Sequence, residues 1–118
     1  MSTLCKIEPM KLLNDLTKHL GIKLPVTITI KTRKGKDCDA LYLPNYSDRT
    51  GKLIGHKITI YTVGTSRSFE TLLAHELIHA LQEEKRLAEF HGPFFAQTAE
   101  LLEWDFGIKE IYLQEIDE

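Results

Sequence analysis

The chain has 118 residues, of which 42% are hydrophobic and 27% are charged, and its formal net charge at pH 7 is −2. This length fits one compact domain with a single core, so we expect residues 1–118 to form one domain and exclude a disordered chain. The slightly acidic balance argues against nucleic-acid binding through the overall electrostatic field, which requires a basic surface.

The first half of the chain predicts one helix and two clear strands. Apolar residues recur at helical spacing in residues 9–20, and Gly21 would end that helix. Residues 26–32 and 56–62 are rich in β-branched side chains that alternate with polar ones, which is typical of strands.

A hairpin is expected between these two strands. Residues 33–37 contain Gly35 and predict a turn, after which residues 38–43 would form a return strand that Pro44 stops. Residues 45–55 are polar and predict a loop. Three strands would therefore form a small sheet.

The second half predicts two helices. A long helix should begin near Ser66 or Ser68, either of which can cap it, and should end before His91, since Gly92 and Pro93 cannot continue it. Residues 93–106 predict a second helix that begins at a proline and ends at Gly107. The pattern of residues 108–118 fits a short helix or a strand, and the fold class is α+β.

The long helix carries a pattern that is typical of zinc metalloproteases, H-E-x-x-H, at residues 75–79. His75 and His79 lie one helical turn apart, so their rings can bind one ion. Glu76 points about 100° away from His75 and is placed to take a proton from a water on that ion. Leu73, Leu77, Ala80 and Leu81 would anchor the opposite face of the helix.

A catalytic zinc ion usually has three protein ligands, so a third is needed. His91 follows the helix at the Gly-Pro reversal and is the favoured candidate. Glu100 and Glu103, on the next predicted helix, are the alternatives. Cys5 and Cys38 are the only cysteines and are far apart, so we expect free thiols and no cysteine metal site.

These residues resemble the motif of the SprT-like zinc metalloproteases, the family that includes Spartan. The resemblance covers residues 66–102, where H-E-x-x-H is followed by His91, Gly92, Pro93 and an aromatic residue, Phe94 or Phe95. It implies a compact zincin-like fold, one catalytic zinc held by His75, His79 and His91, and Glu76 as general base. The expected activity is that of a zinc-dependent endopeptidase.

Many members of this family carry a C-terminal zinc ribbon or another DNA-binding segment, and we expect none in residues 1–118. The one basic cluster, at residues 31–36, lies in the predicted turn and is interpreted as a solvated hairpin tip rather than a DNA contact. A protein or peptide substrate is therefore expected, with DNA association implied only by the family. The absence of a secretory signal and of an apolar membrane span predicts a cytoplasmic protein.

Two further features bear on substrate binding. Residues 56–62 would form an edge strand beside the cleft, to which an extended peptide could pair. Stabilisation of the oxyanion has four candidates that the sequence does not rank: Tyr42, Tyr46, Tyr61 and Arg67. Two other functions fit the same residues: a zinc hydrolase of a non-peptide substrate, and a non-catalytic module that zinc stabilises.

Overall fold

The computed structural model describes residues 9–34, 39–63, 67–87 and 91–111, and every structural statement refers to these residues. They form three helices and one three-stranded sheet, which confirms the α+β class. Cys5, Cys38 and the middle of the expected hairpin turn lie outside the described ranges, as does most of the tail. In chain order the elements are α1 (Pro9–Leu20), β1 (Val26–Lys34), β2 (Ala40–Tyr46), β3 (Leu53–Val63), α2 (Phe69–Lys85) and α3 (Pro93–Phe106).

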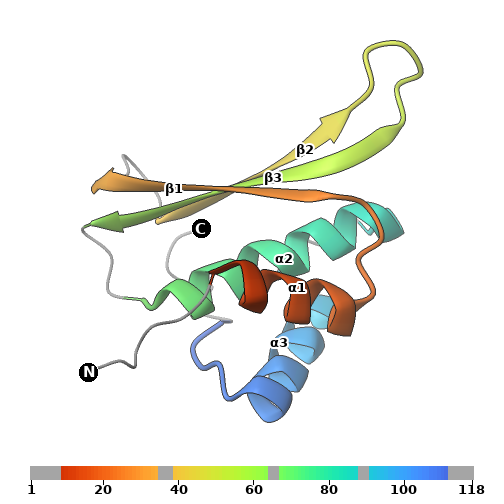
Figure 1. Ribbon diagram of the computed structural model, residues 1–118. Coiled ribbons are helices and arrows are strands. Elements are labelled where there is room, and N and C mark those ends of the chain that lie inside the picture. The colour runs from red at the N-terminus through yellow and green to blue at the C-terminus, as the bar shows by residue number, and fades with distance from the viewer. Residues whose placement is uncertain (1–8, 35–38, 64–66, 88–90, 112–118) are drawn as a thin grey trace.

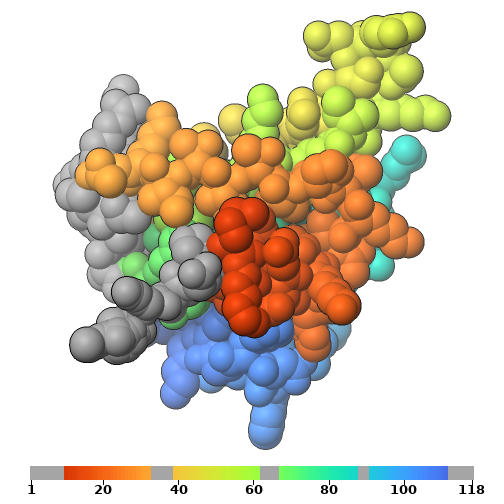
Figure 2. All heavy atoms as spheres, in the orientation of Figure 1, coloured from red at the N-terminus to blue at the C-terminus, as the bar shows by residue number. Residues whose placement is uncertain are grey.

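The three helices lie on one face of the sheet, and the opposite face is open in the described part of the chain (Figure 1). Helix α2 is central, because it packs against β2, β3, α1 and α3. In the space-filling view, α1 lies between β1 and the blue surface of α3 (Figure 2). None of the described helices has both the length and the apolar character that a bilayer-spanning segment requires.

The strand order is β1-β3-β2, with β1 parallel and β2 antiparallel to β3. The expected hairpin between β1 and β2 is therefore wrong, since β3 lies between them; the hairpin joins β2 to β3 through residues 47–52. The expectation that residues 56–62 form an edge strand is also wrong. Burial on the helix-covered face fits this order: Ile58 and Ile60 of β3 are almost fully buried, which suits the central strand, whereas Ile30 of β1, the partner of Ile60, is 43% exposed.

Pro44 does not stop β2, which continues to Tyr46. A proline lacks the N–H group that a central strand must donate on one side, but an edge strand tolerates it. Because β2 is an edge strand, Pro44 can lie opposite His56 within the ladder. The loop predicted for residues 45–55 is shorter as a result, since its two ends belong to β2 and β3.

The start of α2 and both ends of α3 follow ordinary capping chemistry, whereas α2 ends at Lys85, before the predicted position, with Arg86 in the left-handed region at a φ of 58°. Ser68, one of the two predicted caps, accepts a hydrogen bond from the backbone N–H of Thr71 at 3.1 Å. Helix α3 starts at Pro93 and is ended by Gly107, whose φ of 72° is in the left-handed region that glycine adopts easily. The predicted bounds of this helix are confirmed.

Helix α2 is buried on almost all sides, and not on one face alone as its sequence indicated. Every residue from Thr71 to Ile78 is buried, including His75 and Glu76. Its apolar residues join the main core with α1, α3 and the sheet. The largest fully buried members of this core are Leu16, Ile58, Ile60, Leu72, Leu73, Leu77, Ile78, Phe95 and Leu102. The polar side chains on α2 are thus held in a packed interior.

A buried polar network ties the end of α2 to the sheet. Nε2 of His56, whose ring is buried, lies 2.8 Å from a carboxylate oxygen of Glu84, and the Tyr42 hydroxyl lies 2.8 Å from Nδ1 of the same ring. Glu84 also accepts hydrogen bonds from the backbone N–H groups of Lys23 and Leu24, at 3.0 and 2.9 Å. These contacts keep the pKa of Glu84 below its usual value, although burial acts in the opposite direction and is the largest single influence.

We expect Glu84→Ala to lower the free energy of unfolding by about 2–4 kcal/mol, because it removes the acceptor of three donors, one of them on a buried ring. Urea denaturation measures this. Glu100→Ala removes an exposed carboxylate from α3 and should change stability by no more than about 0.5 kcal/mol. Equal stability of the two variants would contradict the role assigned to Glu84.

Candidate metal centre

Three imidazoles meet on one side of α2. His75 and His79 lie on the helix, and His91 comes from the segment just before α3. One ring nitrogen from each histidine lies within 4.8 Å of the other two, and among the described residues this is the one group of at least three potential ligands so arranged. The structure therefore brings together the three histidines that the sequence predicts as metal ligands.

The spacing of two of these nitrogens suits a zinc ion. Nε2 of His75 lies 3.3 Å from Nε2 of His91. Two nitrogens that each lie about 2.0–2.1 Å from one ion, at a tetrahedral angle, are about 3.3–3.4 Å apart. Three imidazoles are also a donor set that zinc binds in catalytic sites, so the residues present fit this metal.

Hydrogen bonds on the far side of two rings orient them. Nδ1 of His75 donates to the carbonyl oxygen of Ile111 at 2.9 Å, and Nδ1 of His79 lies 2.9 Å from Oε1 of Gln82. A carbonyl oxygen can only accept, so the proton of a neutral His75 is on Nδ1 and its Nε2 carries a lone pair. Such contacts fix the tautomer and the ring orientation that metal binding needs.

Phe95 packs among the three imidazoles. Its ring centroid is 4.8, 5.0 and 4.9 Å from those of His75, His79 and His91, and its side chain is fully buried. Because Phe95 lies on the first turns of α3, the ring couples the position of that helix to the geometry of the histidines. The sequence motif included this aromatic residue, but its packing role emerges from the structure.

The environment keeps two of the histidines neutral. Burial lowers the pKa of His75 to about 3; the nearby His79, His91 and Arg67 add to the lowering, and the hydrogen bond to Ile111 opposes it. Burial also lowers the pKa of His79, with a smaller contribution from His91. Neutral imidazole is the form that coordinates a metal ion, so both groups are in the required state at pH 7.

Glu76 follows His75 on α2 and is 8% exposed. The carboxylate alternatives for the third ligand are placed differently, since Glu100 and Glu103 are exposed on α3 and belong to no group of three potential ligands among the described residues. Of the candidate ligands, His91 is therefore the residue that joins His75 and His79.

The four residues considered for oxyanion stabilisation have different surroundings in the structure. The hydroxyl group of Tyr42 is hydrogen-bonded to His56, and burial raises the pKa of Tyr42 above its usual value. Tyr46 donates its hydroxyl to Glu83. Tyr61 is half-buried on β3. Arg67 has a buried guanidinium nitrogen and lies close enough to His75 for its charge to lower the pKa of that ring.

Two contributors to the site were missed from the sequence. Gln82 is spaced three residues after His79, and this spacing on a helix was a usable signal. The role of the Ile111 carbonyl oxygen had no such signal in the sequence, because every residue has a backbone carbonyl oxygen. It reaches His75 because the segment after α3 folds back along α2, where the Thr71 hydroxyl also donates to the carbonyl oxygen of Lys109 at 2.7 Å.

Comparisons of the chain with protein-family models, with curated proteins and with solved structures find no match.

The metal-free protein should lose stability as the pH falls from 6.5. His75 has a folded-state pKa of about 3 and an unfolded value of 6.5, so the unfolded state binds more protons throughout this window. Because of this one group, the free energy of unfolding should be about 2 kcal/mol lower at pH 5 than at pH 7.5. Urea denaturation of the chelator-treated protein at both pH values measures the loss.

The matched variant is His75→Gln, which has no titrating ring at this position. Its stability should fall less between pH 7.5 and pH 5 than that of the original chain. The same loss in both proteins would show that His75 is not held neutral by burial.

Proposed function

We propose that the chain is a zinc-dependent endopeptidase with a zincin-like fold, similar to the SprT-like metalloproteases. His75, His79 and His91 hold the zinc ion, and Glu76 is the general base. The observation that carries this proposal is the convergence of three imidazoles, two from one helix and one from beyond a chain reversal. Glu76, the buried residue that follows His75, supports a hydrolytic role, since a purely structural zinc site has no use for a base.

A bound zinc ion would act as a Lewis acid and lower the pKa of a coordinated water from 15.7 towards about 7. The chain's own residues perform the remaining tasks. The hydrogen bonds to Ile111 and Gln82 hold His75 and His79 with Nε2 directed to the site. Glu76 accepts the proton of the attacking water and delivers it to the leaving amine of the cleaved bond.

Arg67 is the residue to which we assign stabilisation of the negative charge that develops on the carbonyl oxygen. The charge of Arg67 contributes to the lowered pKa of His75, so its guanidinium acts on the group of three histidines. A fixed cation in a site with little water stabilises a developing oxyanion strongly.

Edge strand β2 is the strand that we assign to substrate binding. It packs on α2, the helix that carries two of the histidines, and its outer edge is unpaired in the described sheet. An extended peptide can add to such an edge through backbone hydrogen bonds, which gives affinity with little sequence preference.

Replacement of Glu76 by glutamine tests the general base. Glu76→Gln should retain zinc and lower the rate of casein cleavage at least ~100-fold, because the amide cannot accept a proton. His79→Ala should lose both zinc and cleavage, since it removes a ligand. Bound metal is measured by mass spectrometry and cleavage by release of labelled fragments.

The variants also separate the rival functions. Equal cleavage by Glu76→Gln and the original chain would contradict the base assignment. A zinc-loaded original chain that leaves casein intact but hydrolyses single-stranded nucleic acid or a small amide would contradict the endopeptidase assignment. A chain that cleaves none of these, and unfolds when zinc is removed, would be a zinc-stabilised module.

A further inference from the structure

The last turns of α3 expose two apolar side chains on one face. The Trp104 side chain is 79% exposed and that of Leu101 is 57% exposed, and the three-residue spacing makes them neighbours on the helix surface. Tryptophan is highly buried on average in folded proteins, and it is enriched among the residues that contribute most to protein interfaces. In the space-filling view, the blue surface of the end of α3 projects from the body of the molecule (Figure 2).

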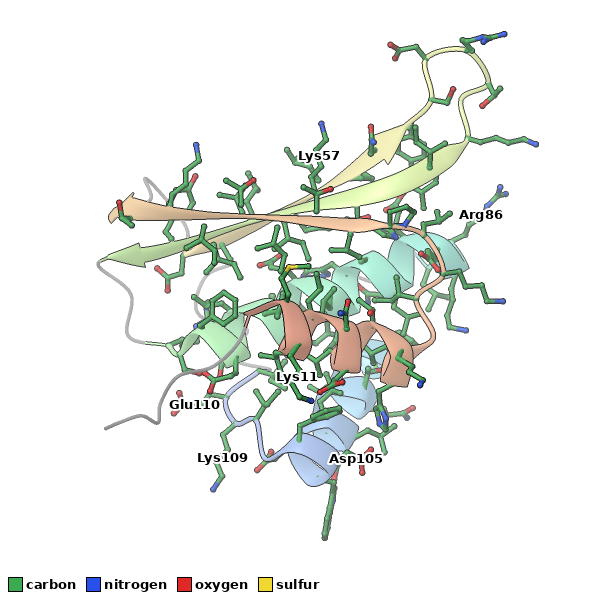
Figure 3. The ribbon with its side chains drawn as sticks, viewed as in Figure 1. Lys11, Lys57, Arg86, Asp105, Lys109 and Glu110 are labelled. Carbon is green, nitrogen blue, oxygen red and sulfur yellow. The ribbon has the colours of Figure 1, made fainter. Side chains whose placement is uncertain are left out.

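Charged side chains lie beside Trp104. Glu100, Glu103 and Lys109 line a cavity of about 390 Å³ together with Trp104. An adjoining cavity of about 190 Å³ is lined by Glu100, Glu103 and Glu110. Lys109 and Glu110 lie on the segment that follows α3, beside the end of the helix (Figure 3). We call the surface formed by these groups the acidic Trp104 face; it comprises Glu100, Leu101, Glu103, Trp104, Lys109 and Glu110.

Lys109 offsets part of the charge of the three carboxylates, and the face keeps a net negative charge. None of its three carboxylates forms an ion pair with another described residue. The last turn of α3 contains no basic residue, so Glu103 lies at the negative end of the helix dipole. Asp105, in the same turn, is paired with His19 at 2.7 Å and is not part of the face.

The arrangement does not suit a metal ion, an anion or a second copy of the chain. The three carboxylates are not among the described groups whose ligand atoms lie within 4.8 Å of one another, so they are too widely spaced for one metal ion. Nucleic acid and acidic lipid would be repelled by them. Two copies of the face would bring like charges together, and the chain's own residues 112–118 carry three acidic residues and no basic one.

A guanidinium or ammonium group remains the complementary ligand. It can interact with several carboxylates that are too far apart for a metal ion, and it is attracted to the face of an indole ring. Apolar neighbours of that cation would contact Leu101 and the rest of the Trp104 ring. Both the charge and the apolar character of the face are satisfied by such a segment.

We propose that the acidic Trp104 face docks a segment of a partner protein that contains arginine or lysine next to apolar residues. The cationic side chain lies over the Trp104 ring and between the carboxylates. The face consists of the last turns of α3 and the segment after it, and its use requires neither zinc nor cleavage. The docking proposal can therefore hold or fail independently of the proposed function.

Trp104 is the single tryptophan of the chain, so its fluorescence reports occupancy of the face. The probe is a short synthetic peptide of arginine, leucine and glycine, titrated into the full chain. We expect a saturable blue shift of the emission. The same peptide with glutamate in place of every arginine should produce no shift.

Two matched charge reversals localise the binding. Glu103→Lys should weaken binding of the arginine peptide about tenfold, because it puts a like charge beside the ligand. Asp48→Lys changes the net charge equally, from an exposed position in the β2–β3 loop, and should alter the affinity less than twofold.

Three outcomes would overturn the proposal. The first is no shift with the arginine peptide. The second is equal weakening of peptide binding by Glu103→Lys and Asp48→Lys, which would show that the effect depends only on the net charge of the protein. The third is a blue shift that appears when the protein alone is concentrated, because that would assign the face to a second copy of the chain.

Discussion

The hydrogen bond from Nδ1 of His75 to the carbonyl oxygen of Ile111 determines what the buried side of α2 can bind. It puts the proton of the neutral ring on Nδ1 and leaves the lone pair of Nε2 directed at the other two histidines. A ring in the other tautomer would present an N–H group there. The bond also links the segment after α3 to α2, so the position of that segment and the state of the ligand are coupled.

Burial of α2 supplies the second constraint. Polar residues in a packed core have few alternative rotamers, and Phe95 contacts all three imidazoles from α3. At the other end of the helix, Glu84 joins α2 to His56 and to the backbone before β1. Helix α2, which carries two of the histidines, is thus held by contacts with α3, with the segment after α3 and with the sheet, which is the rigidity that a preorganised site requires.

Local signals in the sequence predicted much of this structure. Capping and proline chemistry act over a few residues, so the sequence predicted the first helix, the cap at Ser68 and the helix bounds at Pro93 and Gly107. The three histidines could be grouped from helical spacing and from the reversal at Gly92-Pro93. These features depend on near neighbours in the chain.

Features that depend on distant segments were not predictable in the same way. The hairpin was assigned to β1 and β2 because they are consecutive, whereas β3, which carries the buried Ile58 and Ile60, takes the central position between them. The carbonyl of Ile111 and the ring of Phe95 enter the site through tertiary packing. Pro44 looked like a strand end, and its position at an edge made it acceptable within the strand.

The metal content of the purified chain tests the central claim most directly. We expect one zinc ion per chain at neutral pH, measured by mass spectrometry against protein concentration, and its loss in His91→Ala. Glu100→Ala, which removes a carboxylate outside the cluster, should retain the full amount. A chain that takes up no zinc when it is supplied, or a His91→Ala variant that binds it as tightly as the original, would contradict the account.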